Sequence, residues 1–331
     1  MTEFRPLPQD RRPRIAVLDD YMGVAHRLAD WSRVQARADV TFLTEALPPG
    51  PATVAGLRGF DAICLLRERS AIPADLLRQL PELRAIAATG KLNRTLDYAA
   101  ARDLGIAVMT TSGSGNGIYA TVELAWGLII GLMRHIPEES AAMRTGGWQT
   151  RLGNALYGRT LGLVGLGKLG GRMVDIARAF GMEVLAWSPN LTPERAEAAG
   201  ATYVTKEDLL QRSDVVSLHL VLGPTTRGVI GAADLALMRS DAILVNTARG
   251  PLVDTGALVA ALQSGKLRGA GIDVYDSEPL PADAPIRQLP NALLTPHLGY
   301  SVQETFTNFY RETVENLEGW LDGQPRRLAE I

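Results

Sequence analysis

The sequence predicts an α/β fold with two doubly wound parallel-sheet domains. Short β-branched runs alternate with helical patterns from residue 14 onward, a long apolar helix pattern at 118–135 interrupts them, and a second alternating series follows. Such alternation is the sequence form of repeated βαβ units on a parallel sheet. A length of 331 residues also suits two domains, each with its own hydrophobic core.

The first series contains five expected strands separated by helical stretches. They are RIAVLDD at 14–20, DVTFL at 39–43, DAICLL at 61–66, LRAIAA at 83–88 and GIAVM at 105–109. The helix pattern that follows at 118–135 is apolar on most sides. This is typical of a buried helix, and we expect it to lie between two domains.

The second series contains seven expected strands. They are TLGLVGLG at 160–167, MEVLAWS at 182–188, ATYV at 201–204, DVVSLHL at 214–220, DAILVNTA at 241–248, RGAGIDV at 268–274 and NALLTPH at 291–297. A terminal helix is predicted for 301–323, where Gly323 provides the stop signal.

Composition excludes several classes of protein. The 34 Lys and Arg against 36 Asp and Glu leave a net charge of −2, so we expect no nucleic-acid partner. The single cysteine, Cys64, lies in an apolar run, so we expect a buried strand residue, no disulfide within the chain and no metal site. The N-terminus lacks the apolar segment of a signal peptide, and the longest apolar stretch, 124–133, is about half a membrane span. We therefore expect a cytoplasmic protein without a membrane partner.

A glycine motif predicts a dinucleotide site. Gly165, Gly167 and Gly170 form G-x-G-x-x-G between an expected strand and an expected helix. The first glycine allows a tight turn, the second allows close approach of a pyrophosphate, and the third allows the helix to pack on the strand. The helix N-terminus then offers free N–H groups to the phosphates. In this context the motif favours NAD or NADP binding over a merely structural glycine turn.

One residue normal for this site is missing. The acid that binds the adenosine ribose is expected about 20 residues after the motif, and Ser188 stands in its place. An acid there repels a 2′-phosphate, so its loss removes the selection against NADP. Asn190 can also bond a ribose, and the nearest arginine is Arg195 on the following helix pattern. Strict NAD selectivity is therefore not expected, and an ordinary strand-end turn is the alternative interpretation.

Three polar residues at or after strand ends suggest a single catalytic site. Arg249, Glu278 and His297 each follow an expected strand or its exit loop. Individually they could be a surface ion pair, a turn residue and a loop histidine, but behind a phosphate loop they suit hydride chemistry on a carbonyl acid. An arginine can clamp a carboxylate through two N–H groups, a histidine can protonate an alkoxide, and a carboxylate can orient the histidine.

Four motifs, in this order, resemble the D-specific 2-hydroxy acid dehydrogenases, a family that includes glycerate, hydroxypyruvate and phosphoglycerate dehydrogenases. The motifs are GLVGLGKLG at 162–170, NTARGPLVD at 246–254, GIDVYDSEPL at 271–280 and TPHLGY at 295–300. The resemblance implies that Arg249 binds substrate, that His297 is the acid/base and that Glu278 is its partner. It implies that Asp273 bonds the nicotinamide carboxamide. It implies cofactor contacts from Gly165, Gly167, Lys168, Leu169, Gly170, Ser188, His219, Thr247, Ala248, Arg249, Asp273, His297 and Gly299. It implies substrate contacts from Lys91, Leu92, Arg249 and His297.

The resemblance also implies a domain arrangement. Residues 1–112 and 300–331 form a discontinuous, flavodoxin-like substrate domain, and residues 113–299 form an inserted NAD(P)-binding Rossmann domain. Hinge motion near 110–118 and 298–302 closes the cleft. A homodimer is implied, to which the helix at 118–135 is a candidate contributor unless it is buried within one chain.

The chain departs from the family pattern at two places. The loop ATGKLNRTLD at 88–97 carries Lys91 and Arg94, and the segment LLRERS carries Arg67 and Arg69. These cations suggest a phosphorylated or dicarboxylic substrate, and surface ion pairs with Glu68 are the alternative interpretation. The loop at 219–228, where Val221 and Gly223 replace the usual Pro and Thr, is expected to alter adenosine recognition.

We therefore hypothesise an NAD(P)-dependent oxidoreductase that reduces a small 2-oxo acid such as glyoxylate, hydroxypyruvate or a phosphorylated analogue, or catalyses the reverse oxidation. The alternative is a dinucleotide-sensing binding protein that resembles the transcriptional corepressors of this fold. The sequence has no long disordered extension for recruiting partners, which disfavours that alternative. Formate oxidation is disfavoured, because the resemblance implies Gln beside the histidine in formate-oxidising members of this fold, and this sequence has Glu278 there.

Overall fold

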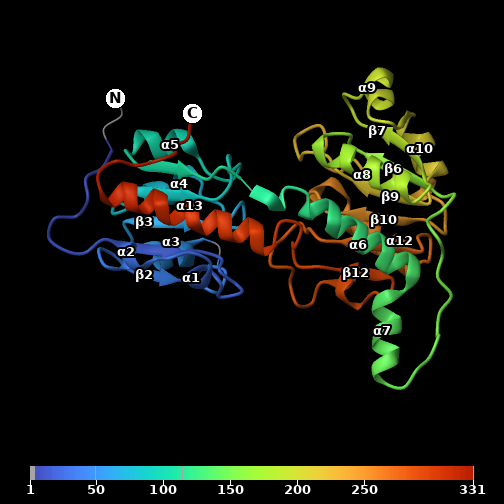
Figure 1. The fold of residues 1–331 in the computed structure, drawn as a ribbon, viewed down its shortest axis with the longest axis horizontal. Helices are drawn as coiled ribbons and strands as arrows, with labels where there is room; N and C mark the ends of the chain where they lie inside the picture. The colour runs from blue at the N-terminus through green and yellow to red at the C-terminus, as the bar shows by residue number, and fades with distance from the viewer. Residues whose placement is uncertain (1–3, 49, 114, 331) are drawn as a thin grey trace. The chain divides into compact units, whose positions relative to one another are not determined.

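The computed structural model describes residues 4–48, 50–113 and 115–330, which form two compact units (Figure 1). The first unit lies within Met1–Ile118 and Val302–Ile331, and the second is Tyr119–Ser301. The sequence placed the two crossings after residues 112 and 299. Residues 115–117 lie in the first unit because they pack against the C-terminal helix of that unit.

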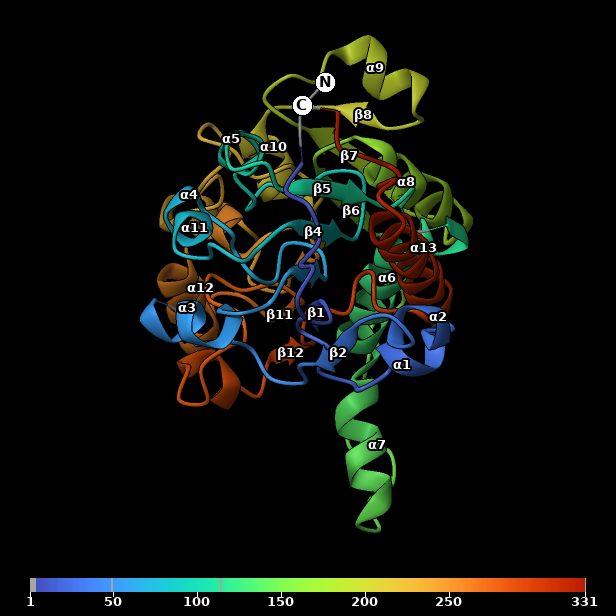
Figure 2. The same cartoon turned by 90° about the vertical axis from the view of Figure 1, so that its left-hand side faces the viewer.

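The first unit contains a five-stranded parallel sheet in the order β2-β1-β3-β4-β5, which is the flavodoxin-like order. The strands are β1 (Arg14–Val17), β2 (Asp39–Phe42), β3 (Ala62–Leu65), β4 (Ala85–Ala88) and β5 (Ala107–Thr110). The helices are α1 (Ala25–Leu28), α2 (Ser32–Gln35), α3 (Pro51–Leu57), α4 (Ala74–Arg78), α5 (Tyr98–Asp103), the 3₁₀ turn η1 (Gly115–Gly117) and α13 (Gln303–Leu321). Figure 2 shows α3, α4 and α5 on one face of this sheet and α1, α2 and α13 on the other.

Helices on both faces explain why β3 and β4 are apolar throughout. All residues of AICL and AIAA are buried, as is usual for a parallel sheet covered on both sides. Cys64 lies buried in β3, as expected.

The second unit contains a seven-stranded parallel sheet in the order β12-β11-β10-β9-β6-β7-β8. The strands are β6 (Thr160–Val164), β7 (Glu183–Trp187), β8 (Thr202–Tyr203), β9 (Val215–Leu218), β10 (Ile243–Asn246), β11 (Gly269–Ile272) and β12 (Ala292–Leu294). The helices are α6 (Ala120–Arg134), α7 (Ile136–Arg144), α8 (Lys168–Ala179), α9 (Pro193–Ala198), α10 (Lys206–Arg212), α11 (Ala232–Leu237) and α12 (Thr255–Gln263), with 3₁₀ turns η2 (Gly250–Leu252) and η3 (Pro285–Gln288). The strand order from β8 to β11 is that of the Rossmann fold, and β12 extends it. The predicted fold class is confirmed.

Two hydrophobic cores enclose this second sheet. The core on one face contains residues of α6 and α8, and the core on the other contains residues of α10, α11 and α12. The apolar residues of α6 pack on β10, β11 and α8 of their own unit, so the burial of this helix is satisfied within one chain.

One helix was not expected from the sequence. Helix α6 ends at Arg134 because His135 adopts a left-handed conformation with φ 53°, and α7 then starts at Ile136 with a proline in its first turn. None of the residues of α7 is buried, so its polar sequence gave no amphipathic signal. Among the described residues, no helix is both long enough and apolar enough to cross a membrane.

Candidate active site

The predicted site residues of the second unit lie at one edge of its sheet. Because its strands are parallel, their carboxyl ends meet at the same edge, where doubly wound sheets bind their ligands. That edge carries Gly165 after β6, Ser188 after β7, His219 after β9, Thr247 after β10, Asp273 after β11 and His297 beyond β12.

Each glycine of the loop after β6 meets a different steric demand. Gly165 has φ +108°, and a Cβ there would lie 2.7 Å from the backbone carbonyl carbon of His219. A Cβ on Gly170 would lie 2.3 Å from the carbonyl oxygen of Gly165, so glycine lets α8 pack on the loop. A Cβ on Gly167 would instead meet nothing within 4 Å. That open backbone is where a pyrophosphate can approach.

The start of α8 fits the diphosphate of NAD or NADP. No side chain caps the helix, and its first turn, which begins with Lys168 and Leu169, holds no acidic residue. The N–H groups there therefore remain available to an anion. Farther along the edge, the hydroxyl of Thr247 is buried and has no hydrogen-bond partner among the described residues, as expected for a group that meets a ligand.

The turn at Ser188 contains a feature that the sequence did not reveal. The Leu191 N–H donates to the Ser188 carbonyl (3.1 Å), which closes the turn. Arg195 reaches back from α9, and its Nη1 donates to the Asn190 carbonyl (3.0 Å). A guanidinium therefore lies at the turn that replaces the usual acidic residue.

The main chain of His219 packs against Gly165 of the glycine loop. Its ring Nε2 lies 2.9 Å from the hydroxyl oxygen of Ser217. Burial lowers the pKa of His219 to about 4, so the ring is neutral at pH 7. In the loop that follows, the Thr226 hydroxyl accepts from the Gly223 N–H (2.8 Å) and donates to the Val221 carbonyl (2.7 Å). One threonine thus orders the remodelled loop.

The turn after β10 orients Arg249. Asn246 holds this turn, because its Oδ1 accepts from the Ala248 N–H (3.0 Å) and its Nδ2 donates to the Arg249 carbonyl (2.9 Å). The half-buried Arg249 donates from Nη1 to the Ala248 carbonyl (2.7 Å). Its positive charge also contributes to lowering the pKa of Glu278, so the two side chains belong to one electrostatic site.

The structure brings Glu278 and His297 together. Glu278 Oε2 lies 2.5 Å from His297 Nδ1, and Glu278 Oε1 accepts from the Tyr275 N–H (2.9 Å). His297 has a left-handed backbone with φ 55°, and its side chain remains 23% exposed. Since Nδ1 is occupied by Glu278, Nε2 is the nitrogen left for chemistry.

The protonation state of Glu278 follows from its neighbours. Burial raises its pKa, but the hydrogen bond and charge of His297, the Tyr275 N–H and Arg249 together lower it below the ordinary 4.5. A carboxylate with a lowered pKa stabilises the folded protein above its ordinary pKa, and this contribution is lost as the pH falls through the lowered value. Glu278 is therefore ionised at neutral pH.

Asp273 anchors the loop that carries His297. The fully buried carboxylate accepts from the Thr295 hydroxyl (2.6 Å), the Leu298 N–H (2.7 Å) and the Gly299 N–H (2.9 Å). Its carbonyl also accepts from the His297 N–H (2.8 Å). Burial raises the pKa of Asp273 above its ordinary value. The hydrogen bonds from these donors and the charge of His297 act in the opposite direction but are outweighed. Its predicted contact with the nicotinamide carboxamide stays a prediction.

Sequence reasoning missed the residues that brace this edge. The Tyr275 hydroxyl lies within hydrogen-bond distance of two carbonyl acceptors, those of Ile272 (3.0 Å) and Thr295 (2.9 Å). It therefore links the carboxyl ends of β11 and β12. Asn246 and Thr295 support Arg249 and Asp273 as described above. The available signal was their position, since each is a polar residue at the end of a buried strand or within three residues of it.

In the first unit, Lys91 and Leu92 lie in the loop after β4. Neighbouring amides are already used: Gly90 N–H donates to Thr111 Oγ1 (2.7 Å), Asn93 N–H to Tyr98 Oη (2.9 Å) and Arg94 N–H to Glu68 Oε1 (3.3 Å). Among the described residues, the N–H groups of Lys91 and Leu92 have no acceptor. Two consecutive free N–H groups can bind an anion.

The cations of the first unit divide into two groups. Arg94 forms an ion pair with Glu68 (3.6 Å) in which the arginine is 55% exposed and the glutamate only 12% exposed. Arg67 Nη1 donates to the Thr89 carbonyl (3.3 Å), and Arg69 Nη1 donates to the Asp19 carbonyl (3.2 Å). The Arg69 guanidinium also stacks 4.8 Å from the ring centre of Tyr21. These two arginines follow β3 at the switch point of the flavodoxin-like sheet.

A Rossmann sheet with an open glycine loop, a His–Glu pair and a nearby arginine defines a class, the nicotinamide-dependent oxidoreductases. Residues 126–299 match the family model described as D-isomer specific 2-hydroxyacid dehydrogenase, NAD binding domain. The chain belongs to the D-isomer specific 2-hydroxyacid dehydrogenase family, whose members use NAD(P).

The relatives include glyoxylate reductases and D-3-phosphoglycerate dehydrogenases. The chain is 38% identical to a glyoxylate reductase of Aeropyrum pernix over 287 residues, which cover 84% of each chain. It is 37% identical to a D-3-phosphoglycerate dehydrogenase of Methanocaldococcus jannaschii over 245 residues, which cover 73% of this chain and 46% of that relative. A crystal structure of a phosphoglycerate oxidoreductase from Vibrio cholerae O395 superposes with a TM-score of 0.86 at 35% identity and covers 94% of this chain and 99% of that one.

Proposed function

We propose that this protein interconverts a small 2-oxo acid and the corresponding D-2-hydroxy acid, of the glyoxylate, hydroxypyruvate or phosphoglycerate type. The observation that carries the proposal is the 2.5 Å contact between Glu278 and His297, with Arg249 in the same electrostatic site. An imidazole whose Nδ1 is held by an ionised carboxylate presents Nε2 for proton transfer to a developing alkoxide.

The residues divide the chemistry among them. In the reducing direction, Arg249 binds the substrate carboxylate and polarises the carbonyl, and His297 gives the Nε2 proton to the oxygen that becomes the hydroxyl. In the oxidising direction, neutral His297 takes that proton back. Glu278 keeps the ring oriented in both directions because it accepts from Nδ1. The bound nicotinamide supplies the hydride in one direction and accepts it in the other.

The first unit is proposed to contribute to substrate binding as well. The N–H groups of Lys91 and Leu92 suit the same carboxylate that Arg249 binds, which has two oxygens and can accept from several donors. Arg67 and Arg69 suit a second anionic group, because both guanidiniums are held in place by backbone carbonyls and one is stacked on Tyr21. This favours a phosphorylated or dicarboxylic acid as substrate.

The test is oxidation of NADH and NADPH, followed by absorbance, against a panel of 2-oxo acids. Glyoxylate and hydroxypyruvate test the class, and phosphohydroxypyruvate and 2-oxoglutarate carry the second anionic group. We expect turnover, with lower KM values for the acids that carry two anionic groups. No turnover with any acid would overturn the proposed function, whereas equal KM values would overturn only the second anionic subsite.

The coenzyme preference provides a separate prediction. Ser188→Asp should shift the ratio of kcat/KM for NAD to that for NADP in favour of NAD, because the new carboxylate bonds the ribose hydroxyls and repels the 2′-phosphate. We expect at least about a tenfold shift, the effect of ~1.4 kcal/mol. A matched Ser264→Asp variant, at the exposed end of α12, should leave the ratio unchanged. An unchanged ratio in Ser188→Asp would show that this position does not select the coenzyme.

We also propose a homodimer. Helix α7 and the segment after it expose large apolar side chains, namely Ile136, Met143, Trp148, Leu152 and Tyr157. Figure 1 shows α7 projecting from the rest of its unit. Such a group of exposed apolar residues is typical of an interface. Sedimentation equilibrium should give twice the mass of one chain, and Leu152→Ser should weaken the association; a wild-type monomer at micromolar concentration would contradict the proposal.

A further inference from the structure

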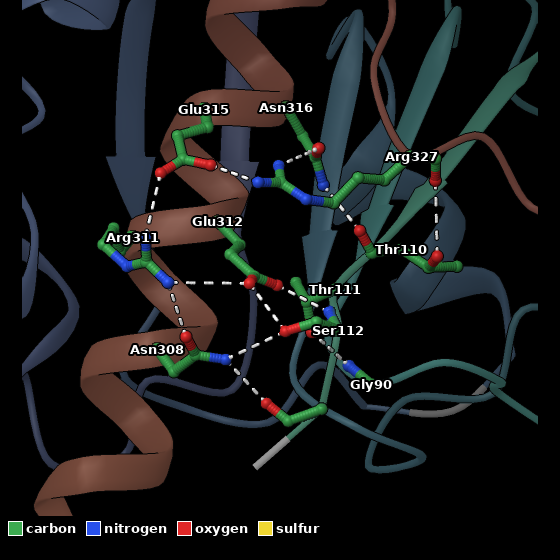
Figure 3. Close-up of polar contacts among 11 residues, drawn as sticks. Gly90, Thr110, Thr111, Ser112, Asn308, Arg311, Glu312, Glu315, Asn316 and Arg327 are labelled. Atoms are coloured by element: carbon green, nitrogen blue, oxygen red, sulfur yellow. Dashed lines mark hydrogen bonds and ion pairs between the residues drawn. The ribbon is translucent and has the colours of Figure 1, made fainter. Parts of the chain in front are cut away.

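The segment that leaves β5 is bound at three of its residues, Thr110, Ser112 and Gly113, to the C-terminal helix (Figure 3). The Thr110 carbonyl accepts from Asn316 Nδ2 (2.8 Å). The Glu312 carboxylate accepts two hydrogen bonds from Ser112, one from its N–H to Oε2 (2.6 Å) and one from its hydroxyl to Oε1 (2.6 Å). The Gly113 carbonyl accepts from Asn308 Nδ2 (2.8 Å). The start of the first crossing is therefore fixed to one face of α13.

Glu312 is an unusual residue for this position. It is 5% exposed, although a glutamate on a terminal helix is normally solvated. Its two oxygens meet the paired donors of Ser112, and Arg311 lies 3.6 Å from one of them. Because a buried carboxylate is costly unless it is bonded, this contact must persist for the helix to pack.

Thr111 connects this fixed segment to the substrate loop. It lies between the residues held by Asn316 and Glu312, and it is 2% exposed. Its Oγ1 accepts from the Gly90 N–H (2.7 Å), and its own N–H donates to the Gly90 carbonyl (3.3 Å). The residue that precedes Lys91 is therefore bonded in both directions to the segment that α13 holds.

Gly90 also has a backbone conformation that favours glycine. Its φ is +89°, and a Cβ there would lie 1.6 Å from Nη1 of Arg67, so the Arg67 guanidinium lies directly against this residue. Thr111, Tyr98 and Glu68 accept from the N–H groups on either side, while those of Lys91 and Leu92 have no acceptor in the part of the chain that the structure describes.

We infer that Thr111 is a positioning residue for the substrate carboxylate, and that Glu312 supports it by fixing Ser112. The inference rests on the proposed function, because it concerns the acid bound by the Lys91 and Leu92 amides. The geometry of these amides depends through Gly90 on a segment that continues directly into the crossing to the other unit.

The first experiment compares Thr111→Val with Thr111→Ser. Valine has nearly the same volume but removes the acceptor of the buried Gly90 N–H, whereas serine keeps it. We expect Thr111→Val to raise the KM of glyoxylate about tenfold, with little change in kcat and none in the KM of the coenzyme. Thr111→Ser should restore the wild-type value. A merely structural role would lower the thermal midpoint and leave the KM values unchanged.

The second experiment tests the support from α13. Glu312→Ala should raise the glyoxylate KM in the same direction, and its effect should be non-additive with that of Thr111→Val, because the two residues act through one segment. Arg37→Met is the matched control, since Arg37 bonds the C-terminal end of the same helix, at Asp322 and the Leu321 carbonyl, away from residues 110–113. This variant should lower stability without changing the KM.

Two measurements do not depend on turnover. Oxamate binding to the NADH-bound protein by calorimetry should weaken about tenfold in Thr111→Val, and amide exchange in peptides covering residues 89–94 should accelerate. If wild type binds oxamate but reduces no acid, the proposed function fails while the positioning inference is still decided by the oxamate affinities. An unchanged oxamate affinity in Thr111→Val would overturn the inference.

Discussion

A His297→Asn variant should lose about 10²- to 10⁴-fold of the rate of 2-oxo acid reduction, the usual contribution of a positioned proton donor. The loss should appear in single-turnover absorbance of bound NADH, because that signal reports the chemical step rather than product release. Coenzyme affinity should change little, since Asn preserves the hydrogen bond from the backbone N–H of residue 297 to the Asp273 carbonyl.

The matched control is His135→Asn. Both histidines have left-handed backbones, with φ 55° at His297 and 53° at His135, and Asn is among the residues that tolerate this conformation. The two substitutions therefore impose the same backbone demand, but only His297 contacts Glu278. His135→Asn should keep the wild-type rate. A His297→Asn variant within about threefold of wild type would refute the acid/base role, which is assigned about 10²-fold or more.

Glu278→Gln separates orientation from proton transfer. The amide oxygen can still accept from Nδ1, so the ring stays oriented, but the negative charge beside it is lost. We expect a loss of rate in both directions that is smaller than the loss in His297→Asn, measured by single-turnover absorbance of the bound nicotinamide. A wild-type rate in Glu278→Gln would show that the charge of Glu278 does not contribute to the reaction.

An Arg249→Lys variant should lose about 10²-fold in kcat/KM for the 2-oxo acid, because misplacing a substrate by about 1 Å costs this much. Lysine keeps the positive charge but offers a point charge instead of two parallel N–H groups, so the carboxylate is held without a fixed orientation. The measurement is steady-state reduction of glyoxylate at saturating coenzyme.

Arg239→Lys is the control for Arg249→Lys. Arg239 forms surface ion pairs with Asp241 and Asp214 and is 46% exposed, so the substitution should change kcat/KM little. If Arg249→Lys retained the wild-type kcat/KM, a two-pronged clamp on the substrate carboxylate would be excluded.

Much of the fold was predictable because parallel strands leave a clear sequence signal. All five expected strands of the first series and all seven of the second form at the expected places. Most are short apolar runs bounded by polar or glycine residues, the pattern that burial on both faces of a sheet requires. The edge strands β2 and β8 are more exposed. Helix α7 was missed because none of its residues is buried, so it has no apolar stripe to detect.

The residues proposed for the site could be chosen from the sequence, but the contacts between them could not. Glu278 and His297 follow adjacent strands, so their proximity at one sheet edge follows from topology. The hydrogen bond from Arg195 to the Asn190 carbonyl depends on where α9 begins and how it is oriented. The sequence of the turn after β7 did not reveal it.

The sequence by itself determined the fold class, the glycine loop and the residues proposed for catalysis, because each depends on local periodicity or on spacing along one chain segment. Only the tertiary structure decided which of these residues meet and which amides remain free. The bond from Ser112 to Glu312 joins residues 200 positions apart, and the bond from Gly90 to Thr111 joins two different strand ends. Hydrogen bonds require positions correct to within a few tenths of an ångström, and such positions are set by packing of the whole unit rather than by local sequence.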